Sequence, residues 1–387
     1  MKKLIYPFLP LFIFLSLSVS VFAAAVQIDT NGYLRKSGRN VVRLSNGTLI
    51  VAVVDTTAGK LKMFSSESLT EFTGTAPAGY YGCSLTADGT NWHVAWFGGA
   101  TTPVLYATGS GTAYPVGETV QTAAFQEGSE ISPTISITLD AGVKPHIAYV
   151  DFPAGAWKVY YTNKIGAGWS AKIQVGTTQG HHPEIAIDTT AGHTNRYNLP
   201  QICYSDPDNS LIKAALADAN DPTTFTVVNP ATQAAEAVNY CAPSICISSA
   251  GVTSVSSVDN SGNRYPNVAY IAESAAWGTA GNWTNQAVGS FTALYGGSLV
   301  AYGNDRWYFT GSAGPIKYSK STNYGAWSAT TQIETGGYFV KARWQYANNP
   351  DYATYGMDYI FGNDPAYWNE LTVAAPPVDT NKMFFMF

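Results

Sequence analysis

Hydrophobic and polar residues alternate with a period of two along much of the chain, most clearly between Ile131 and Gly176. In this stretch Ile, Val, Tyr and Trp alternate with polar residues, and turns rich in Gly, Pro and Asp interrupt them, as expected for half-buried antiparallel strands. The pattern predicts four strands, at 133–139, 145–151, 157–163 and 169–176. A lone sheet of this size would leave one face uncovered, so we expect neighbouring units of the same kind.

The pattern of the second of these strands, PHIAYVD, recurs from one end of the chain to the other. Related segments, expected as second strands, lie at 49–55, 92–98, 200–206 and 266–272, with weaker ones at 306–312 and 355–361. The third and fourth strands also recur, because 317–329 resembles 160–171. Four strands repeated about every fifty residues are typical of a β-propeller. We therefore predict an all-β propeller of seven four-stranded antiparallel blades, which begin near residues 40, 79, 130, 181, 240, 293 and 337.

Two other architectures also contain many short strands. The last unit is the most degenerate, so six blades followed by a divergent segment are an alternative to seven. Two β-sandwiches are a second alternative, but they would not explain why the same pattern returns throughout the chain. Closing a ring requires that no sheet edge is left unpaired, and we expect the segment 25–36 to supply a strand to the last blade.

The first residues differ in character from everything that follows. Lys2 and Lys3 precede an apolar run that ends at Ala23, Ala24 and Ala25, which is the pattern of a cleavable secretory signal peptide. We expect a leader at 1–24, a single propeller domain at 25–387, and a protein that is secreted or periplasmic. A transmembrane anchor is the alternative, because the apolar run is close to spanning length. Once the leader is cleaved, we expect no stable membrane insertion.

Composition narrows the possible partners. Charged residues make up only 12% of the chain and the net charge is −5, which argues against nucleic acid or an anionic membrane. The four cysteines, Cys83, Cys203, Cys241 and Cys246, match no zinc pattern, although export would permit a disulfide. We expect no metal and no cofactor.

The candidate ligand-binding residues follow from the predicted fold. In a propeller, the loops that lead into the first strands and those that join strands two and three converge on one face. Aromatic rings there can stack on the C–H faces of sugars, and polar groups can bind sugar hydroxyls, although such aromatics also pack blade against blade. The candidates before first strands are Tyr80, Tyr81, Glu130, His181, His182 and Tyr240, and those between strands two and three are Asp151, Trp157, Asp206 and Trp277.

Residues 39–55, RNVVRLSNGTLIVAVVD, resemble the opening of sialidase-type propellers. The turn from Ser321 to Trp327 also resembles their Asp-box, with Asn in place of Asp and one residue too few. The resemblance implies that Arg39 is one of three arginines that clamp a substrate carboxylate through planar, charge-assisted hydrogen bonds. It also implies Tyr338 as the nucleophile, Asp55 as the general acid, and Glu184 or Glu236 as the partner of the tyrosine.

The remaining arginines argue against a complete clamp. Arg196 and Arg264 are expected in turns between strands one and two, on the face opposite to the candidate site. The sequence therefore predicts a secreted, sialidase-like propeller that binds a carbohydrate or glycoconjugate through loops on one face. An exo-acting glycoside hydrolase and a scaffold for protein partners are the alternatives.

Overall fold

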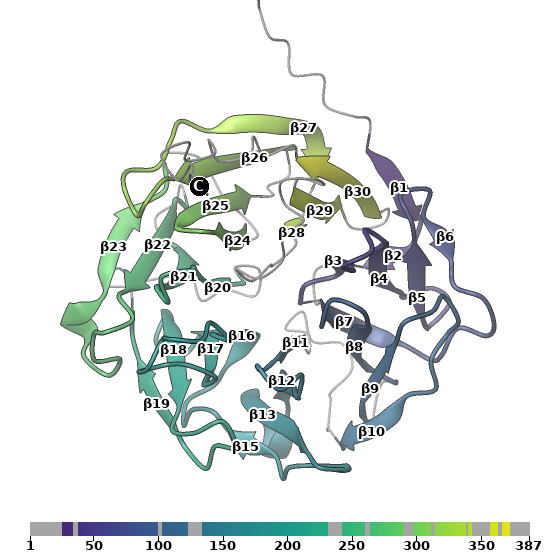
Figure 1. Cartoon of the computed structure of the whole chain (residues 1–387), viewed down its shortest axis with the longest axis horizontal. Helices are drawn as coiled ribbons and strands as arrows, with labels where there is room; N and C mark the ends of the chain where they lie inside the picture. Colours follow the sequence, from purple (N-terminus) through teal and green to yellow (C-terminus); the bar gives the residue numbers. More distant parts are fainter. Residues whose placement is uncertain are drawn as a thin grey trace, which may run out of the picture.

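Each predicted unit forms one antiparallel β-sheet, and the seven sheets are arranged around a central axis (Figure 1). The chain is therefore a seven-bladed β-propeller, as predicted, and neither six blades nor two sandwiches. The computed structural model describes residues 25–33, 38–99, 103–122, 134–230, 242–259, 264–289, 297–310, 314–337, 340–342, 357–362 and 366–371. The expected leader at 1–24 lies outside these residues and stays a prediction.

The blades follow one another in chain order. Blade 1 contains β2 (Gly32–Tyr33), β3 (Val41–Arg43), β4 (Leu49–Asp55), β5 (Lys60–Ser65) and β6 (Thr70–Glu71); blade 2 contains β7 (Tyr80–Ala87), β8 (Trp92–Phe97), β9 (Val104–Gly109) and β10 (Glu118–Gln121). Blade 3 contains β11 (Ile135–Leu139), β12 (Pro145–Asp151), the 3-10 helix η1 (Pro153–Gly155), β13 (Lys158–Ile165), β14 (Gly168–Trp169) and β15 (Ile173–Gln174). Blade 4 contains β16 (His181–Ile187), β17 (Pro200–Asp206), β18 (Leu211–Ala217) and β19 (Phe225–Val228).

The last three blades complete the ring. Blade 5 contains β20 (Ile245–Ile247), β21 (Thr253–Val258), β22 (Pro266–Ile271), the 3-10 helix η2 (Ala280–Asn282) and β23 (Thr284–Ala287); blade 6 contains β24 (Gly297–Tyr302), β25 (Asp305–Thr310), β26 (Gly314–Ser321) and β27 (Thr331–Gly337). Blade 7 contains β28 (Val340–Ala342), β29 (Met357–Gly362) and β30 (Ala366–Leu371), and the N-terminal strand β1 (Val26–Asp29) is its outermost strand. In the described part of the chain, neither helix is long and apolar enough to cross a membrane.

The assignment of strands in blade 5 corrects one prediction. The segment 266–272 was expected to be a second strand, but β22 is the third strand of its blade. The second strand is β21, whose sequence TSVSSV is fully buried. Serines occupy both polar and apolar positions of this strand, so the period-two pattern that marks the other second strands is hidden.

Two contacts close the ring between blades 1 and 7. The strand β1 pairs antiparallel with β30, with Val26 opposite Trp368, which confirms that the N-terminal segment completes the last blade. Nearer the axis, the Arg43 guanidinium binds the buried Asp358 carboxylate through Nε and Nη2, at 3.1 and 2.8 Å. The chain ends are thus joined at the outer edge by a strand and inside by an ion pair (Figure 1).

Serine side chains connect the first strands around the axis. Each first strand is the inner edge of its sheet, and its free backbone N–H groups need partners. The side chains of Ser84, Ser136, Ser244 and Ser298 supply them: each hydroxyl accepts a hydrogen bond from the next described first strand, at 3.0–3.2 Å from the backbone nitrogens of Ile137, Ile185, Leu299 and Ala342. Small polar residues followed by Ile or Leu therefore mark the axis-lining strands.

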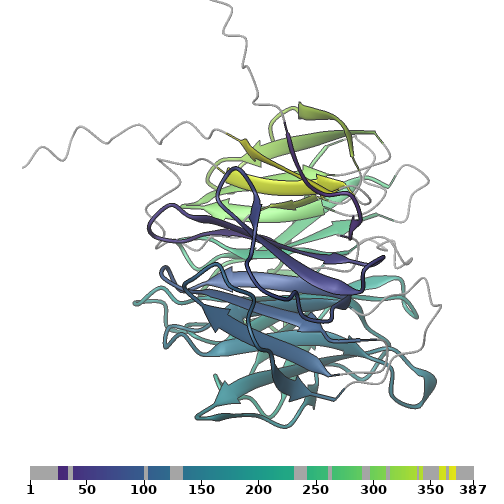
Figure 2. The ribbon, with the colours of Figure 1, turned by 90° about the vertical axis from the view of Figure 1, so that its right-hand side faces the viewer.

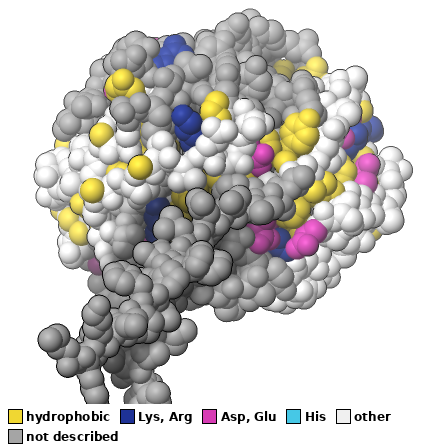
Figure 3. Space-filling view, turned by 90° about the horizontal axis from the view of Figure 1, so that it is seen from above, with side chains coloured by type: hydrophobic (Ala, Val, Ile, Leu, Met, Phe, Trp, Pro, Cys, Tyr) yellow, Lys and Arg dark blue, Asp and Glu magenta, His cyan; other side chains and the backbone are white. Residues whose placement is uncertain are grey.

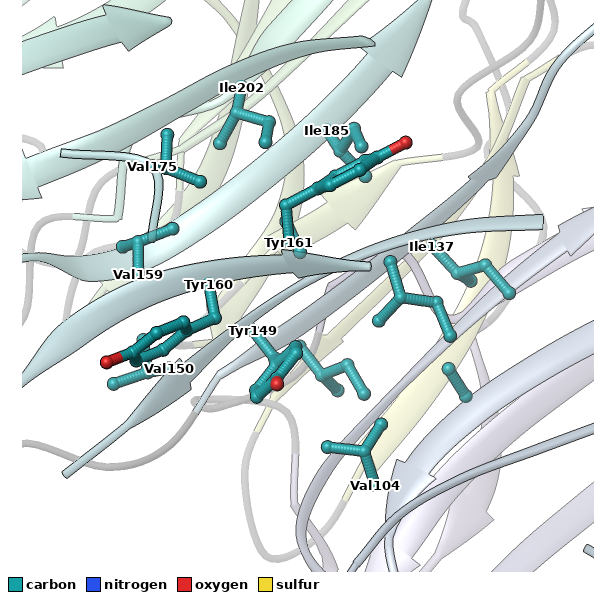
Figure 4. Packing of buried hydrophobic residues seen from close by; sticks show 14 of the residues in the cluster. Val104, Ile137, Tyr149, Val150, Val159, Tyr160, Tyr161, Val175, Ile185 and Ile202 are labelled. Carbon is teal, nitrogen blue, oxygen red and sulfur yellow. The ribbon is translucent and has the colours of Figure 1, made fainter. Parts of the chain in front are cut away.

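The hydrophobic core lies between neighbouring sheets. The largest cluster combines residues of blades 2, 3 and 4, among them Val104, Ile137, Tyr149 and Ile202 (Figure 4). Because each blade packs between its neighbours, the inner strands β11, β12, β16 and β17 of this cluster are buried along their whole length. The connections gather at the two ends of the strands, which Figure 2 shows from the side.

Blades 2 and 3 each contain the same arrangement of an aspartate, a histidine and a tyrosine. In blade 2, the Asp88 carboxylate lies 3.3 Å from His93 Nε2, and the Nδ1 of the same ring lies 2.7 Å from the Tyr106 hydroxyl. The equivalent groups of blade 3 are Asp140, His146 and Tyr161, at 3.4 and 2.5 Å. Burial lowers the pKa of both histidines. These groups tie the turn between strands one and two to strands two and three.

Candidate functional site

Most of the described candidate residues lie on one face of the ring. Because neighbouring strands run in opposite directions, the chain enters every first strand on the same face on which it passes from strand two to strand three. We call this the mouth face and the other the opposite face. Seven candidates from the sequence lie there: Tyr80, Tyr81, His181 and His182 at the starts of β7 and β16, Asp55 and Asp206 at the ends of β4 and β17, and Trp157 before β13. Asp151, at the end of β12, lies on the mouth face as well.

Other candidates lie elsewhere. Glu130, Tyr240 and Tyr338 lie outside the described residues, and their roles stay predictions. The expected position of Trp277 is wrong, because this residue lies between β22 and β23, on the opposite face, where its ring packs against Trp283 at 5.0 Å. The shifted strand assignment of blade 5 also moves Arg264 to the connection between β21 and β22, on the mouth face.

Arg39 reaches across the axis of the ring. Its side chain is buried, and its guanidinium forms an ion pair with Glu184, from the first strand of blade 4. Nη2 also donates hydrogen bonds to the carbonyl oxygens of Ile245 and Leu299, in the first strands of blades 5 and 6, at 2.7 and 3.3 Å. A substrate carboxylate that approached Arg39 would therefore compete with Glu184 and with these carbonyls.

The local sequence explains how Arg39 comes to lie at the axis of the ring. Gly38 lies against the axis, and a Cβ atom there would lie 2.5 Å from the Ser84 hydroxyl oxygen and 2.6 Å from the carbonyl oxygen of Ile135. Only glycine leaves room for the chain at this point. Glu184 in turn precedes Ile185 in the position that serine occupies in blades 2, 3, 5 and 6. The departure from serine is the sequence signal for this ion pair.

Asp55 is held as a carboxylate. Its Oδ2 lies 2.8 Å from Lys62 Nζ, and its Oδ1 accepts a hydrogen bond from the backbone N–H of Ala58 at 2.8 Å. Burial by itself raises the pKa of Asp55, but these hydrogen bonds outweigh it and lower the pKa below its usual value. A general acid must hold a proton near neutral pH, so these contacts favour a turn-capping role over proton donation.

Asp151 and Asp206 have similar surroundings. The Asp151 carboxylate lies 2.6 Å from Lys172 Nζ and accepts a hydrogen bond from the N–H of the next residue at 2.8 Å. Asp206 accepts from the Thr178 hydroxyl at 2.9 Å and lies 3.5 Å from Lys213 Nζ. All three aspartates thus pair with a lysine and stabilise the connection that follows strand two.

Two first strands begin with an irregular pair of residues. The pairing of β7 with β8 shifts between Tyr80 and Cys83, and the pairing of β16 with β17 shifts between His181 and Glu184. In each case the second residue of the pair has a positive φ: 62° at Tyr81 and 52° at His182. Bulky residues rarely adopt this conformation, and such bulges are common beside functional sites.

His181 is buried without satisfied ring nitrogens. Its side chain is 1% exposed, and neither nitrogen has a hydrogen-bond partner in the part of the chain that the structure describes. The ring instead contacts the edges of Trp157 and His182, with centroids 6.3 and 6.2 Å away. Burial lowers the pKa of His181 to about 4, so the imidazole is neutral at physiological pH and can both donate and accept a hydrogen bond.

Tyr80 is the exposed aromatic side chain of this group. It is 36% exposed, and its ring meets that of Tyr81 at 4.7 Å and a near-perpendicular angle. We call Tyr80, Tyr81, Trp157, His181 and His182 the mouth residues. They combine the exposed ring of Tyr80 with the buried, neutral imidazole of His181.

Within the described residues, no group of three or more His, Cys, Asp or Glu side chains could hold a metal ion. Cys83, Cys203 and Cys246 are buried thiols, and Cys241 lies outside the described residues.

The sequence matches no family model and no curated protein. Solved structures share the fold. An ulvan lyase of polysaccharide lyase family PL25, bound to -[GlcA(1-4)Rha3S]-, matches with a TM-score of 0.57 and 7% identity over 92% of this chain and 96% of that one. The polysaccharide lyase Uly1 matches with a TM-score of 0.51 and 8% identity over 90% and 98%. An α-L-arabinofuranosidase from Fusarium graminearum, in complex with an iminosugar inhibitor, matches with a TM-score of 0.50 and 12% identity over 91% and 98%.

These structural neighbours are carbohydrate-active proteins. At such low sequence identity, the similarity establishes the shared propeller fold. It does not establish a sialidase-type site, and the resemblance of residues 39–55 to sialidases stays a prediction.

Proposed function

We propose that this protein is exported and binds glycans on the mouth face, beside the inner ends of blades 2 to 4. The observation that supports the proposal most strongly is the pair of bulged first strands. Both place a residue of positive φ, Tyr81 or His182, at the same face and next to an aromatic or imidazole neighbour. The carbohydrate-active structural neighbours, which match 90–92% of this chain, add support.

The chemistry of the mouth residues suits a sugar. An exposed tyrosine ring such as that of Tyr80 can cover the C–H face of a pyranose, and the unsatisfied nitrogens of His181 can bind a hydroxyl. A buried polar group without a partner destabilises the free protein and gains from a ligand or water that satisfies it. Each contact is weak by itself, and several sugars of one chain would bind together.

A glycan-cleaving enzyme is the second candidate. Two lyases and a glycosidase share this fold, and the neutral His181 could accept a proton at physiological pH. A sialidase-like hydrolase is the more specific form of this candidate, with Arg39, Asp55 and Tyr338 in the roles that the sequence resemblance implies. Arg39 would then have to exchange Glu184 for the substrate carboxylate. Turnover of a fluorogenic sialoside that Arg39→Ala and Tyr338→Phe abolish would support this form, and no turnover by the wild type would exclude it.

A glycan array, followed by titration of the best ligand, tests the binding proposal. Tyr80→Ala should weaken binding about fivefold or more, because stacking of one aromatic ring contributes on the order of 1 kcal/mol or more. Tyr197→Ala is the matched control: Tyr197 is 38% exposed, but it lies between β16 and β17 on the opposite face. Equal loss in both variants, or no binding to any glycan, would contradict the proposal. Complete silence would favour a scaffold for protein partners.

A further inference from the structure

All five histidines of the chain lie in three neighbouring blades, 2 to 4, which we call the histidine sector (Figure 1). In order along β8, β12, β16 and the connection after β16, they are His93, His146, His181, His182 and His193. The first four are 0–5% exposed. On the side of the molecule shown in Figure 3, described lysine, arginine and carboxylate side chains reach the surface, and no described histidine does. Buried imidazoles are thus concentrated in one part of the ring.

One position of the second strands distinguishes blades 2 and 3 from the others. The second residue of this strand is His93 in β8 and His146 in β12. In blades 1, 4, 5, 6 and 7 the same position is occupied by Ile50, Gln201, Ser254, Arg306 and Asp358. Histidine is the side chain whose ordinary change of charge falls between pH 5 and 8. At this position, mild acid therefore adds charge to blades 2 and 3 and leaves the other blades unchanged.

The neutral ring of His146 suits both of its neighbours. Its Nε2 faces the Asp140 carboxylate at 3.4 Å, and its Nδ1 lies 2.5 Å from the Tyr161 hydroxyl. Because a carboxylate only accepts hydrogen bonds, the ring proton belongs on Nε2, and Nδ1 accepts from the hydroxyl. A second proton, on Nδ1, would force the hydroxyl to accept instead. Within the described residues the Tyr161 hydroxyl has no other hydrogen-bond partner, so its own proton would lose its acceptor.

Burial outweighs the charges around His93 and His146. The charged groups that act on these two rings are three carboxylates, which favour a second proton, and two lysines, which oppose it: Asp88, Asp140 and Asp221, and Lys144 and Lys164. The pKa of both histidines nevertheless lies below its ordinary value, because burial disfavours the charged ring. Each ring therefore binds a proton more readily in the unfolded chain. The stability that this contributes is present above the ordinary pKa of histidine and is lost as the pH falls below it.

The mouth belongs to the same sector. Trp157 is part of the hydrophobic cluster that joins blades 2 to 4, and Tyr81 packs against that cluster. The ring of His181 lies 6.3 Å from that of Trp157, and Asp206 is the carboxylate that acts on it electrostatically. Burial outweighs this carboxylate and lowers the pKa of His181 to about 4. A proton on His181 would add a buried charge beside the mouth residues.

We propose that the histidine sector is an acid-sensitive part of the ring, in which protonation of the buried histidines loosens blades 2 to 4, and the mouth residues that they carry, before the other blades. The loosening does not depend on the proposed glycan site. Where both hold, mild acid would release a bound glycan, because the residues that contact it would lose their fixed arrangement.

Amide hydrogen exchange of the full chain, followed by mass spectrometry at pH 7.5 and 5.0, tests the proposal without a ligand. Ordinary carboxylates stay ionised at pH 5.0, so the histidines are the side chains that change charge. Protection factors are corrected for the effect of pH on the intrinsic exchange rate. We expect protection in β7, β12, β13 and β16 to fall at least about tenfold, because one unit of pKa difference changes an opening equilibrium tenfold. Protection in β21, β22 and β25, of blades 5 and 6, should change less than about twofold.

Glutamine variants assign the effect to particular rings. A glutamine amide can donate to Asp140 and accept from Tyr161 without titrating, and blade 4 already has Gln201 at this position. His146→Gln should reduce the loss of protection in β12 and β13 at least about threefold, and His181→Gln should do the same in β16. His193→Gln is the matched control, because the side chain of His193 is 17% exposed, and it should leave the loss unchanged.

Three results would overturn the proposal. Protection that stays constant between pH 7.5 and 5.0 would show that the buried histidines do not open the sector. An equal loss in all blades would show that the ring responds as a whole. A loss in β12, β13 and β16 that both His146→Gln and His181→Gln leave at the wild-type value would show that other groups cause it.

Discussion

The ion pair at the axis gives the sharpest prediction about stability. Arg39 and Glu184 are 5% and 7% exposed, and the Arg39 guanidinium also donates hydrogen bonds to neutral carbonyl oxygens of blades 5, 6 and 7. Glu184→Gln keeps the size of the side chain and removes its charge. The guanidinium would then stay buried and lose its ion pair with Glu184.

The expected cost follows from this burial. Removing one partner of a buried ion pair typically lowers the free energy of unfolding by about 3–5 kcal/mol, because the remaining charge is desolvated without compensation. An exposed pair contributes about 0–1 kcal/mol. The chain offers such a pair as a control: Lys164 and Glu118 are 2.5 Å apart, and their side chains are 26% and 41% exposed.

Urea denaturation at pH 7, followed by the fluorescence of the ten tryptophans, measures the difference. We expect a loss of about 3–5 kcal/mol for Glu184→Gln and less than about 1 kcal/mol for Glu118→Gln. Arg39→Met should also lower the free energy of unfolding. The double variant Arg39→Met with Glu184→Gln should lose less than the two single variants together, because neither charge of the pair is left.

Two outcomes would refute this reasoning. A loss below about 1 kcal/mol in Glu184→Gln would mean that the guanidinium is solvated in spite of its position. Additive effects of the two substitutions would mean that Arg39 and Glu184 are not coupled.

Three further predictions concern ring closure, the axis and pH. Arg43→Gln should lower the free energy of unfolding by about 3–5 kcal/mol in urea denaturation, because Asp358 is fully buried and would lose its ion pair. Gly38→Ala should lower the thermal unfolding temperature, since the added Cβ would overlap the Ser84 hydroxyl and cost about 1–3 kcal/mol. His181 has a folded pKa of about 4 against 6.5 in the unfolded chain, so it binds a proton more readily when unfolded. This difference in pKa contributes on the order of 3 kcal/mol to the free energy of unfolding; the contribution is fully present above pH 6.5 and is lost as the pH falls from 6.5 towards 4. Urea denaturation of the wild type and of His181→Gln across this pH range would measure it.

Each of these predictions has its own control. Gly111→Ala should leave the unfolding temperature unchanged, because nothing lies within 4 Å of the added Cβ. Lys164→Gln, in the exposed pair with Glu118, should lower the free energy of unfolding far less than Arg43→Gln does. If His181→Gln showed the same slope of stability against pH as the wild type, the protonation of His181 would not be the cause, and the buried histidines of blades 2 and 3 would be the next groups to test.

The period-two pattern and its recurrence determined the architecture. Residues close in sequence decide which side chains of a strand face a neighbouring sheet, and they also decide where the backbone turns. For this reason β4, β12 and β17 match the predicted segments 49–55, 145–151 and 200–206. The need to pair every outer sheet edge predicted β1 in blade 7. Blade 5 was assigned one strand out of place because the serines of β21 conceal its alternation.

The partners of the charged residues were decided by the tertiary structure alone. The sequence indicated that Arg39 and Asp55 lie on the mouth face, but not that Glu184 would meet the arginine across the axis or that Lys62 would hold the aspartate. Alternation along a strand depends on the nearest neighbours in the chain. A contact between blades 1 and 4 depends on how seven sheets together close a ring. The sequence of a single segment does not determine that geometry.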